Sequence, residues 1–300
     1  MNDAQLIRTL VFVGGHDRDR IRTLAASGVD AICIDLEDST PLVDKPRSRQ
    51  HFREVAAEIA AAGPLVFART NMPGSGMDED LDAVMCPELH CISLPKVEAG
   101  GSVAEFDARV AEAEAAHGLT PGSLLIRPII ETALGVRNAY DIGAASPRVA
   151  YMGGVEGGIF GDLGGSLGYE QTDDGRETLY LRSKVLVDVR AARVPFPIGG
   201  GTTLRKDPEG ARLFARENRI LGYSGVHCAA SPDVIAAVNA ELTPAMAQLD
   251  EWLEILPTLE AAERAGASVA HVGDRVYDLI GLVRVREQFA LATRLGLLGR

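Results

Sequence analysis

Short apolar runs alternate with segments of helical length eight times between residue 10 and about residue 240. The runs lie at 10–13, 31–34, 65–68, 91–94, 124–130, 148–152 and 196–198 and within 223–230. Each run is bounded by turn residues, which is typical of a parallel strand buried on both faces. Eight strand–helix units in succession predict an α/β fold of the (β/α)8 TIM barrel type over residues 1–240. A doubly wound sheet is the alternative, although it does not normally need eight alternations.

Helical patterns occupy several segments between these runs. They cover 17–27, 44–62, 102–117, 177–193 and 211–221, and Ser102 with Glu105 has the spacing of a capping box. After the barrel, residues 244–266 and a segment ending near 295 indicate helices, with a hairpin around Gly273 and Asp274 between them. This tail is too small to be independent and has little core of its own. We expect residues 241–300 to form a C-terminal helical arm or lid that packs on a neighbouring subunit.

Composition restricts the possible partners. The 300 residues carry a formal net charge of −12, which argues against nucleic acid or an anionic membrane as a partner. The first residues lack the pattern of a signal peptide, and no apolar run approaches the ~20 residues of a membrane span, so we expect a cytoplasmic protein. Cys33, Cys86, Cys91 and Cys228 have no metal-ligand spacing and indicate buried free thiols.

Polar side chains gather where the predicted strands end. They are Asp35, Glu37, Asp38, Arg69, Lys96, Glu131 and Asp162. The C-terminal ends of the strands form the catalytic face of a (β/α)8 barrel, so we expect the functional site there.

Two of these carboxylates follow consecutive strands. Glu131 ends the fifth apolar run, and Asp162 lies in the loop after the sixth. Consecutive parallel strands usually lie side by side, so the two carboxylates can converge. Two hard oxygen ligands with few other protein groups suit Mg²⁺, which keeps waters or substrate oxygens in its other positions. The alternative, which spacing alone favours, is that Glu131 caps a helix and Asp162 sits in a solvated glycine turn.

The loop from Gly153 to Gly168 has eight glycines in 16 positions. It contains neither a dinucleotide-binding nor a P-loop motif. Its glycines would let backbone N–H groups approach an anionic ligand closely, or they simply form a flexible surface loop.

Three further residues each have two interpretations. Arg69 either holds a substrate carboxylate or oxyanion, or forms a structural ion pair with Glu37 or Asp38. Lys96 has the position of a Schiff-base lysine, but the many neighbouring acids favour a structural or electrostatic role. His227, near the eighth strand, is interpreted as a packed residue rather than a base.

Taken together, several stretches resemble the HpcH/HpaI aldolase and citrate lyase β-subunit family, in its CitE-like acyl-CoA lyase branch. The matching pieces are Leu10–Gly15, Ile34–Asp38, Lys45–Arg49, Arg69–Asn71, Leu94–Glu98, Ile130–Val136, Asp162–Gly168 and Gly273–Asp278. Each piece alone is weak, but their order along most of the chain is specific.

The resemblance implies a barrel that assembles as a homotrimer or hexamer, with Mg²⁺ on Glu131 and Asp162. It also implies that Arg69 contacts the substrate and that Asp278 reaches into the site of a neighbouring subunit. The typical reaction breaks or forms a carbon–carbon bond between an acyl-CoA enolate and a 2-oxo acid or aldehyde.

The chain departs from the family pattern in two places. Residues 148–162 form a longer segment than the family pattern has. Near the eighth strand, the family's Gly-Phe-x-Gly-Lys and Ile-His-Pro motifs are replaced by Gly222–Val226 and Ala229–Ser231. The lysine, histidine and proline are therefore absent, which leaves open the acyl partner and the use of CoA.

These observations predict a Mg²⁺-dependent carbon–carbon lyase or aldolase acting on a small 2-oxo or 2-hydroxy acid, with an acyl-CoA as the possible second substrate. Arg69 would stabilise the enolate oxyanion, and Asp278 would exchange a proton opposite the metal. Glu37 and Asp38 would orient metal-bound waters.

The substrate carboxylate would be held by backbone amides around Gly161, next to Asp162 and Leu163. The alternatives are an acyl-CoA thioester hydrolase on the same scaffold and a non-catalytic binding or regulatory subunit. The sequence does not decide between cleavage and synthesis.

Overall fold

The computed structural model describes residues 4–153, 162–170, 172, 174–202 and 206–298. The chain divides into two compact units, Met1–Leu242 and Thr243–Arg300, and each is described by itself.

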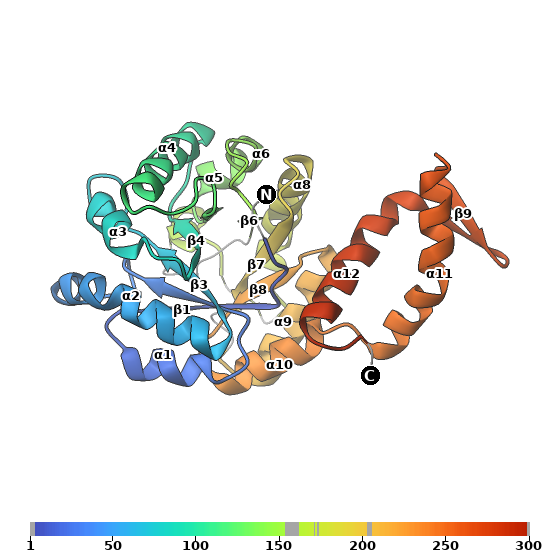
Figure 1. The fold of residues 1–300 in the computed structure, drawn as a ribbon, viewed down its shortest axis with the longest axis horizontal. Coiled ribbons are helices and arrows are strands. Elements are labelled where there is room, and N and C mark those ends of the chain that lie inside the picture. The colour runs from blue at the N-terminus through green and yellow to red at the C-terminus, as the bar shows by residue number, and fades with distance from the viewer. Residues whose placement is uncertain (1–3, 154–161, 171, 173, 203–205, 299–300) are drawn as a thin grey trace. The chain divides into compact units, whose positions relative to one another are not determined.

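The first unit is built on a parallel sheet that closes into a barrel (Figure 1). Its described strands are β1 (Thr9–Gly14), β2 (Ala31–Asp35), β3 (Leu65–Arg69), β4 (Leu89–Leu94), β5 (Leu125–Pro128), β6 (Tyr151–Met152), β7 (Phe196–Thr202) and β8 (Gly225–Cys228). They follow the order β5-β4-β3-β2-β1-β8-β7-β6, so β1 pairs with β8 as well as with β2. Parallel bridges from Ile126 to Val149 and from Ile129 to Gly153 join the two ends of this order. The predicted (β/α)8 fold is therefore confirmed.

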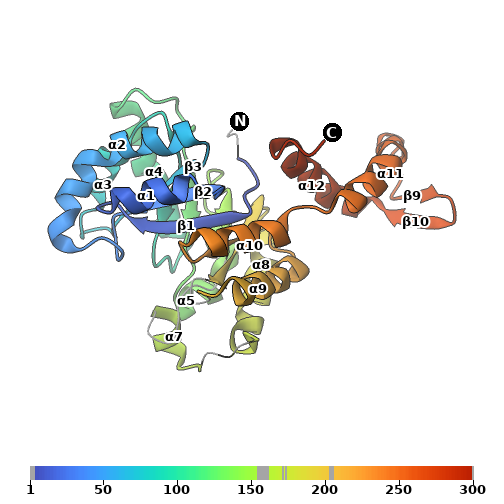
Figure 2. The same ribbon diagram turned by 90° about the horizontal axis from the view of Figure 1, so that it is seen from below.

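Helices connect the strands and cover the outside of the barrel (Figure 2). They are α1 (Arg18–Ala25), α2 (Lys45–Ala62), α3 (Met77–Val84), α4 (Gly100–Ala116), α5 (Ala133–Arg137), α6 (Ala139–Gly143), α7 (Asp162–Leu167), α8 (Leu179–Ala191), α9 (Pro208–Leu221) and α10 (Pro232–Leu242). Helix α2 buries Phe52, Val55, Ala56 and Ile59, the face that its apolar spacing predicts.

The structure differs from the sequence-based expectation at three helices. The prediction of a capping box at Ser102 is wrong, because α4 already begins at Gly100 and has no side-chain cap. Part of the glycine-rich stretch, Asp162–Leu167, is the helix α7 rather than loop. The sequence analysis also missed α3, whose eight residues, Met77–Val84, are too short for a clear apolar period.

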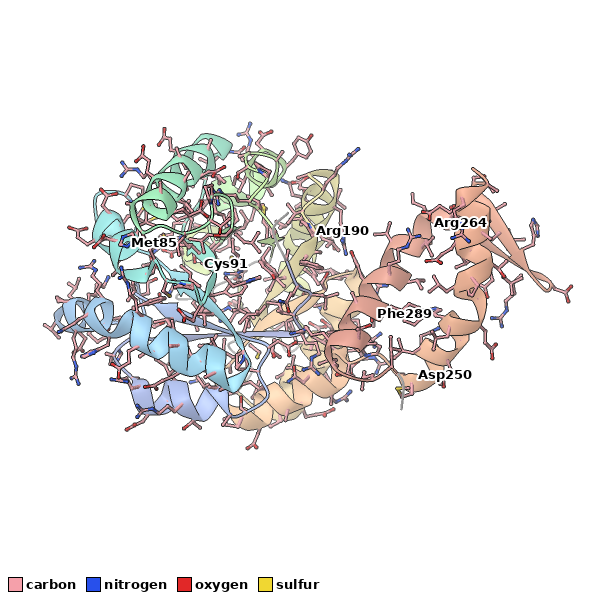
Figure 3. The ribbon with its side chains drawn as sticks, viewed as in Figure 1. Met85, Cys91, Arg190, Asp250, Arg264 and Phe289 are labelled. Atoms are coloured by element: carbon pink, nitrogen blue, oxygen red, sulfur yellow. The ribbon has the colours of Figure 1, made fainter. Side chains whose placement is uncertain are left out.

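Apolar side chains form two layers, one between strands and helices and one inside the barrel. The inner layer consists of Ile7, Leu10, Ala31, Cys33, Phe67, Cys91, Leu125, Ala150, Tyr151 and Ile198. Figure 3 shows Cys91 among the barrel side chains, and all four cysteines are buried free thiols, as predicted.

The contact between β8 and the chain before β1 leaves no room for a side chain at Gly225. A Cβ there would lie 2.0 Å from the carbonyl oxygen of Ile7. We expect Gly225→Ala to lower the free energy of unfolding by about 1–3 kcal/mol, the usual cost of overpacking. Denaturant unfolding measures this loss. Gly101→Ala is the control, because its Cβ would meet nothing within 4 Å in the first turn of α4; a similar loss there would contradict the steric explanation.

The second unit consists of α11 (Met246–Arg264), an antiparallel hairpin of β9 (Val269–Val272) and β10 (Arg275–Asp278), and α12 (Leu282–Arg294). Its small core contains Ile255, Leu259, Ala270 and Leu282. The rings of Trp252 on α11 and Phe289 on α12 meet edge to face with their centroids 6.5 Å apart. Across the described parts of both units, no helix has the length and apolar character needed to cross a membrane.

Candidate active site at the barrel mouth

An arginine and an aspartate pair at the ends of two adjacent strands. Asp35 of β2 and Arg69 of β3 are register partners. The guanidinium donates from Nε to Asp35 Oδ1 at 2.7 Å and from Nη2 to Oδ2 at 2.5 Å. Burial alone would raise the pKa of Asp35, but the hydrogen bonds and charge of Arg69 lower it below its usual value. The fully buried Asp35 therefore stays ionised and fixes the plane of the guanidinium.

Glu37 joins this pair to Lys96, two residues after the end of β4. Its Oε2 lies 2.8 Å from Arg69 Nη1, and its Oε1 accepts a hydrogen bond of 2.7 Å from Lys96 Nζ. Burial raises the pKa of Glu37 despite these cations. The expected ion pair of Arg69 with Glu37 is present, and the pair with Asp35 was missed. Residues 35 and 69 end two consecutive strands, and consecutive parallel strands usually lie side by side. Aligning the ends of these two strands would therefore have indicated the Asp35–Arg69 pair.

The partly buried ring of Phe12 lies close to two arginines. The guanidinium carbon of Arg69 lies 5.0 Å from the centre of the Phe12 ring, and that of Arg127 lies 5.5 Å from it. Arg127 comes from β5 and is fully buried. The sequence analysis treated it as part of an apolar run, although an arginine inside such a run is itself a signal of a buried polar contact.

Lys96 contacts both predicted metal ligands. Its backbone N–H donates to Glu131 Oε1 at 2.7 Å, and its Nζ lies 3.6 Å from Asp162 Oδ2 and 3.4 Å from Asp38 Oδ2. Glu131 is nearly buried, whereas the side chains of Asp38 and Asp162 are 62% and 49% exposed. Lys96 therefore contacts a sheltered carboxylate through its backbone N–H and an accessible one through its ammonium.

This donor set fits a magnesium ion better than a metal with an all-protein shell. Within the described ranges, no group of three or more His, Cys, Asp or Glu side chains is placed to hold a metal ion. Mg²⁺ commonly uses one or two carboxylates and completes its octahedron with water or substrate oxygens. Glu131 and Asp162 supply that minimal set.

The other predicted ligand-binding residues are placed differently. Gly161 lies outside the described residues. The side chain of Leu163 is fully buried in the core beneath α7, so only its backbone is a candidate for contact with a ligand.

Asp278 belongs to the second unit, and its side chain caps a 3₁₀ turn. Its Oδ1 accepts a hydrogen bond of 3.1 Å from the N–H of Ile280. An aspartate immediately before a helical turn commonly has this capping role. A role in a neighbouring subunit's site stays a prediction.

A cavity of about 330 Å³ opens at the mouth beside this cluster. Arg69, Phe12 and His227 line it, together with the exposed residues Arg20 and Lys206. The His227 ring packs on Phe12 with centroids 4.4 Å apart, as its interpretation as a packed residue predicts. The cavity therefore combines an aromatic wall with basic side chains.

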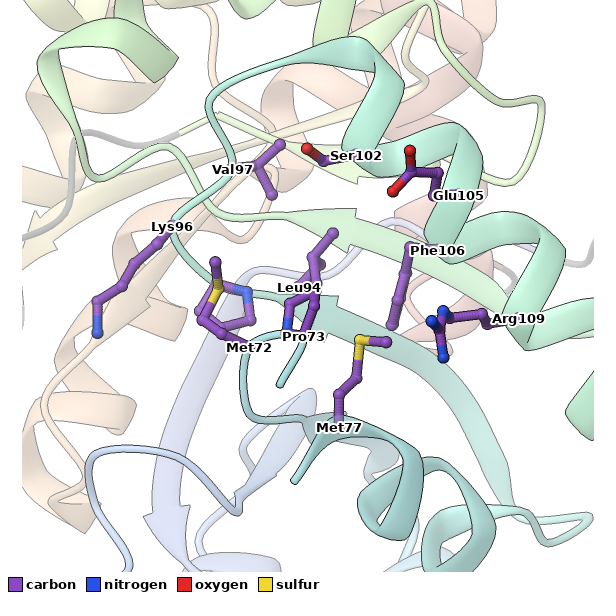
Figure 4. Close-up of a pocket in the computed structure, with 11 residues that line it drawn as sticks. Met72, Pro73, Met77, Leu94, Lys96, Val97, Ser102, Glu105, Phe106 and Arg109 are labelled. Carbon is purple, nitrogen blue, oxygen red and sulfur yellow. The ribbon is translucent and has the colours of Figure 1, made fainter. Parts of the chain in front are cut away.

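A second cavity, of about 100 Å³, lies between β4, α4 and the start of α3 (Figure 4). Its walls are mostly apolar, with Met77, Leu94 and Phe106 buried around it. Figure 4 shows the Lys96 side chain at its edge, extending away from Met77 and Phe106. The ammonium therefore belongs to the acidic mouth and not to this apolar space.

A closed parallel barrel with charged groups at the C-terminal ends of its strands is the architecture of a (β/α)8-barrel enzyme. Residues 8–230 match the family described as HpcH/HpaI aldolase/citrate lyase. A citrate lyase subunit beta-like protein from Deinococcus radiodurans is 32% identical over 267 residues, 87% of this chain and 88% of that protein. An L-malyl-CoA/beta-methylmalyl-CoA lyase from Rhodobacter capsulatus is 29% identical and covers 93% of this chain and 92% of its own length. The chain therefore belongs to this family of lyases, as the motifs predicted.

A solved structure of similar fold is CitE from Mycobacterium tuberculosis in complex with magnesium, acetoacetate and coenzyme A. The TM-score is 0.66 and the sequence identity 22%, and the match covers 99% of this chain and 100% of that one. This likeness supports the barrel fold.

Proposed function

We propose that the protein is a Mg²⁺-dependent carbon–carbon lyase that cleaves or forms a 3-hydroxyacyl-CoA, or a related 2-hydroxy or 2-oxo acid, through an enolate. The observation that carries this proposal is the cluster at the mouth. Glu131 and Asp162 contact the same lysine, and Glu37 links that lysine to Arg69, whose orientation Asp35 fixes. The names of the lyase relatives and the magnesium in CitE support the same reaction class.

Glu131 and Asp162 would hold the metal. Bound there, Mg²⁺ would supply Lewis-acid stabilisation of negative charge on substrate oxygens. The nearly buried Glu131 is the fixed ligand, because its Oε1 is already positioned by the Lys96 N–H. Asp162 is the accessible ligand, at the side from which substrate would enter.

Cleavage requires the substrate hydroxyl to lose its proton. The oxygen electrons form the carbonyl of the departing 2-oxo acid or aldehyde while the carbon–carbon bond breaks. The electron pair of that bond passes to the thioester fragment as an enolate, and a proton added to the enolate carbon completes the acyl product. Synthesis is the reverse sequence.

Arg69 would stabilise the enolate oxygen. It lines the mouth cavity, and Asp35 holds two of the five N–H groups of its guanidinium, which prevents rotation. A cation that needs no reorientation during the reaction is the arrangement that lowers the barrier to charge development. Glu37 and Asp38 would orient waters at the mouth while Lys96 offsets part of their charge.

The basic wall of the cavity supports a CoA thioester as substrate. The family's lysine and histidine near the eighth strand are absent from this chain. Arg20, which donates to the Ala230 carbonyl at 3.2 Å, and Lys206 provide positive charge at the same cavity. They would replace the missing cations opposite the phosphate groups of CoA.

An end-point assay with purified protein, Mg²⁺ and a panel of short 3-hydroxyacyl-CoA esters tests the reaction class. We expect a 2-oxo acid or aldehyde and a shortened acyl-CoA in equal amounts. Release of free CoA thiol without carbon–carbon cleavage would identify a thioester hydrolase instead. Inertness toward the CoA esters and toward free 2-hydroxy acids, in protein shown to bind Mg²⁺, would favour a binding subunit.

Asp278 supports a prediction about assembly, which we propose to be a homotrimer or hexamer. If its carboxylate acts in the neighbour's site, mixing inactive Asp278→Asn subunits with inactive Glu131→Gln subunits should restore partial activity. Steady-state rates before and after subunit exchange measure this. Should exchange be demonstrated by mass-labelled subunits while the mixture stays inactive, Asp278 does not act in trans.

A further inference from the structure

Lys96 contacts four carboxylates of the barrel mouth. Its Nζ lies 2.7 Å from Glu37 Oε1, 3.4 Å from Asp38 Oδ2 and 3.6 Å from Asp162 Oδ2. Its backbone N–H donates to Glu131 Oε1 at 2.7 Å. One residue therefore links both proposed metal ligands to the acidic residues beside them.

The backbone of Lys96 is strained where it makes these contacts. Its φ is +50°, a left-handed conformation that residues with a Cβ seldom adopt. Such conformations persist when surrounding contacts over-determine them, and they concentrate at functional sites. At Lys96, the hydrogen bond to Glu131 and the ion pairs of the ammonium are the contacts that hold this conformation.

The ammonium is the main counter-charge for the accessible acids. The other nearby cation, Arg69, already donates two hydrogen bonds to Asp35 and pairs with Glu37. The Lys96 ammonium lies within ion-pair distance of Glu37, Asp38 and Asp162, and carboxylates that close to one another repel without a cation among them. Lys96 thus occupies the electrostatic position that a bound cation would also favour.

We propose that the Lys96 ammonium is a resident counter-cation, which holds the mouth carboxylates together in the metal-free protein and competes with the divalent metal for Asp162. This inference rests on the proposed metal site at Glu131 and Asp162. It makes Lys96 a positioning residue that keeps metal affinity moderate. Metal binding displaces the ammonium from Asp162 toward Glu37 and Asp38, with which it already forms ion pairs.

Lys96→Met removes the competing charge and tests the proposal without an activity assay. Isothermal titration of the substrate-free protein with Mn²⁺ should give a dissociation constant about tenfold lower than in the wild type, since one like charge near the metal is removed. The melting temperature of the metal-free variant should fall, because the acids lose their counter-charge. Saturating Mn²⁺ should therefore stabilise the variant more than it stabilises the wild type.

Two control variants separate this effect from a general loss of charge. Lys96→Arg keeps a cation at the mouth and should bind Mn²⁺ within about threefold of the wild type, because the like charge is retained. Lys184→Met removes a lysine that pairs with Asp188 and donates to the Arg137 carbonyl at 2.9 Å, and it should leave the dissociation constant unchanged.

Equal or weaker Mn²⁺ binding by Lys96→Met would overturn the proposal. If that variant does not fold, Lys96→Gly replaces it, because glycine adopts the positive φ without strain. Absence of Mn²⁺ binding by the wild type itself would refute the metal site of the proposed function. If the wild type binds Mn²⁺, the Glu131→Gln variant does not, and the Lys96→Met variant binds it as the wild type does, only the role of the lysine would be refuted.

Discussion

Glu131→Gln and Asp162→Asn are each expected to weaken Mg²⁺ binding by about 100-fold or more and to abolish turnover. Loss of an outer partner of a metal ligand typically costs about 10–100-fold in affinity, and loss of one of two carboxylate ligands must cost more. Glutamine keeps an oxygen that accepts the Lys96 N–H, so the fold around residue 131 should persist. Calorimetric titration measures binding, and circular dichroism checks the fold.

The assignment of the metal site also makes a prediction for the wild-type enzyme. EDTA should abolish activity, and Mg²⁺ or Mn²⁺ should restore it. Glu112→Gln is the matched control, since Glu112 is exposed on α4, and neither binding nor turnover should change. Full activity in Glu131→Gln or Asp162→Asn would show that these carboxylates do not form the metal site.

Arg69→Lys is expected to lower kcat by about 100-fold or more, comparable to the loss of one oxyanion donor. The structure gives the reason that the substitution is not conservative. The planar guanidinium makes two parallel hydrogen bonds to Asp35 while it lines the mouth cavity, and a single ammonium cannot do both. Steady-state kinetics on the substrate found in the panel assay measures the change.

Arg69→Lys should also lower the free energy of unfolding by about 1–3 kcal/mol, because the buried Asp35 loses one of its two hydrogen bonds from the guanidinium and keeps only the backbone N–H of Glu37 or Ser39 on that oxygen. Asp35→Asn separates the two effects. It removes the charge that fixes Arg69 but leaves the guanidinium in the cavity, so we expect a smaller fall in kcat than for Arg69→Lys. An unchanged kcat in Arg69→Lys, with only reduced stability, would mean that Arg69 is purely structural.

Local patterns in the sequence were sufficient to predict the barrel. Buried parallel strands must be apolar on both faces, so each of the eight strands left a short apolar run bounded by turns. The polar residues that follow these runs then had to lie on one face, because parallel strands all end at the same edge. Glu131, Asp162, Arg69, Glu37 and Asp38 were found in this way, before any distance was known.

Only the tertiary structure decided how those residues are connected. The Asp35–Arg69 pair depends on strand register, and a shift of one residue would have pointed one of the side chains outward. The position of Lys96 depends on a positive φ, which the sequence does not indicate when the residue is not a glycine. Arg127 was hidden in an apolar run, since its partner Phe12 is 115 positions away and meets it only when the barrel closes. Patterns within one segment specify the elements, whereas contacts between distant segments determine the charges and orientations within the site.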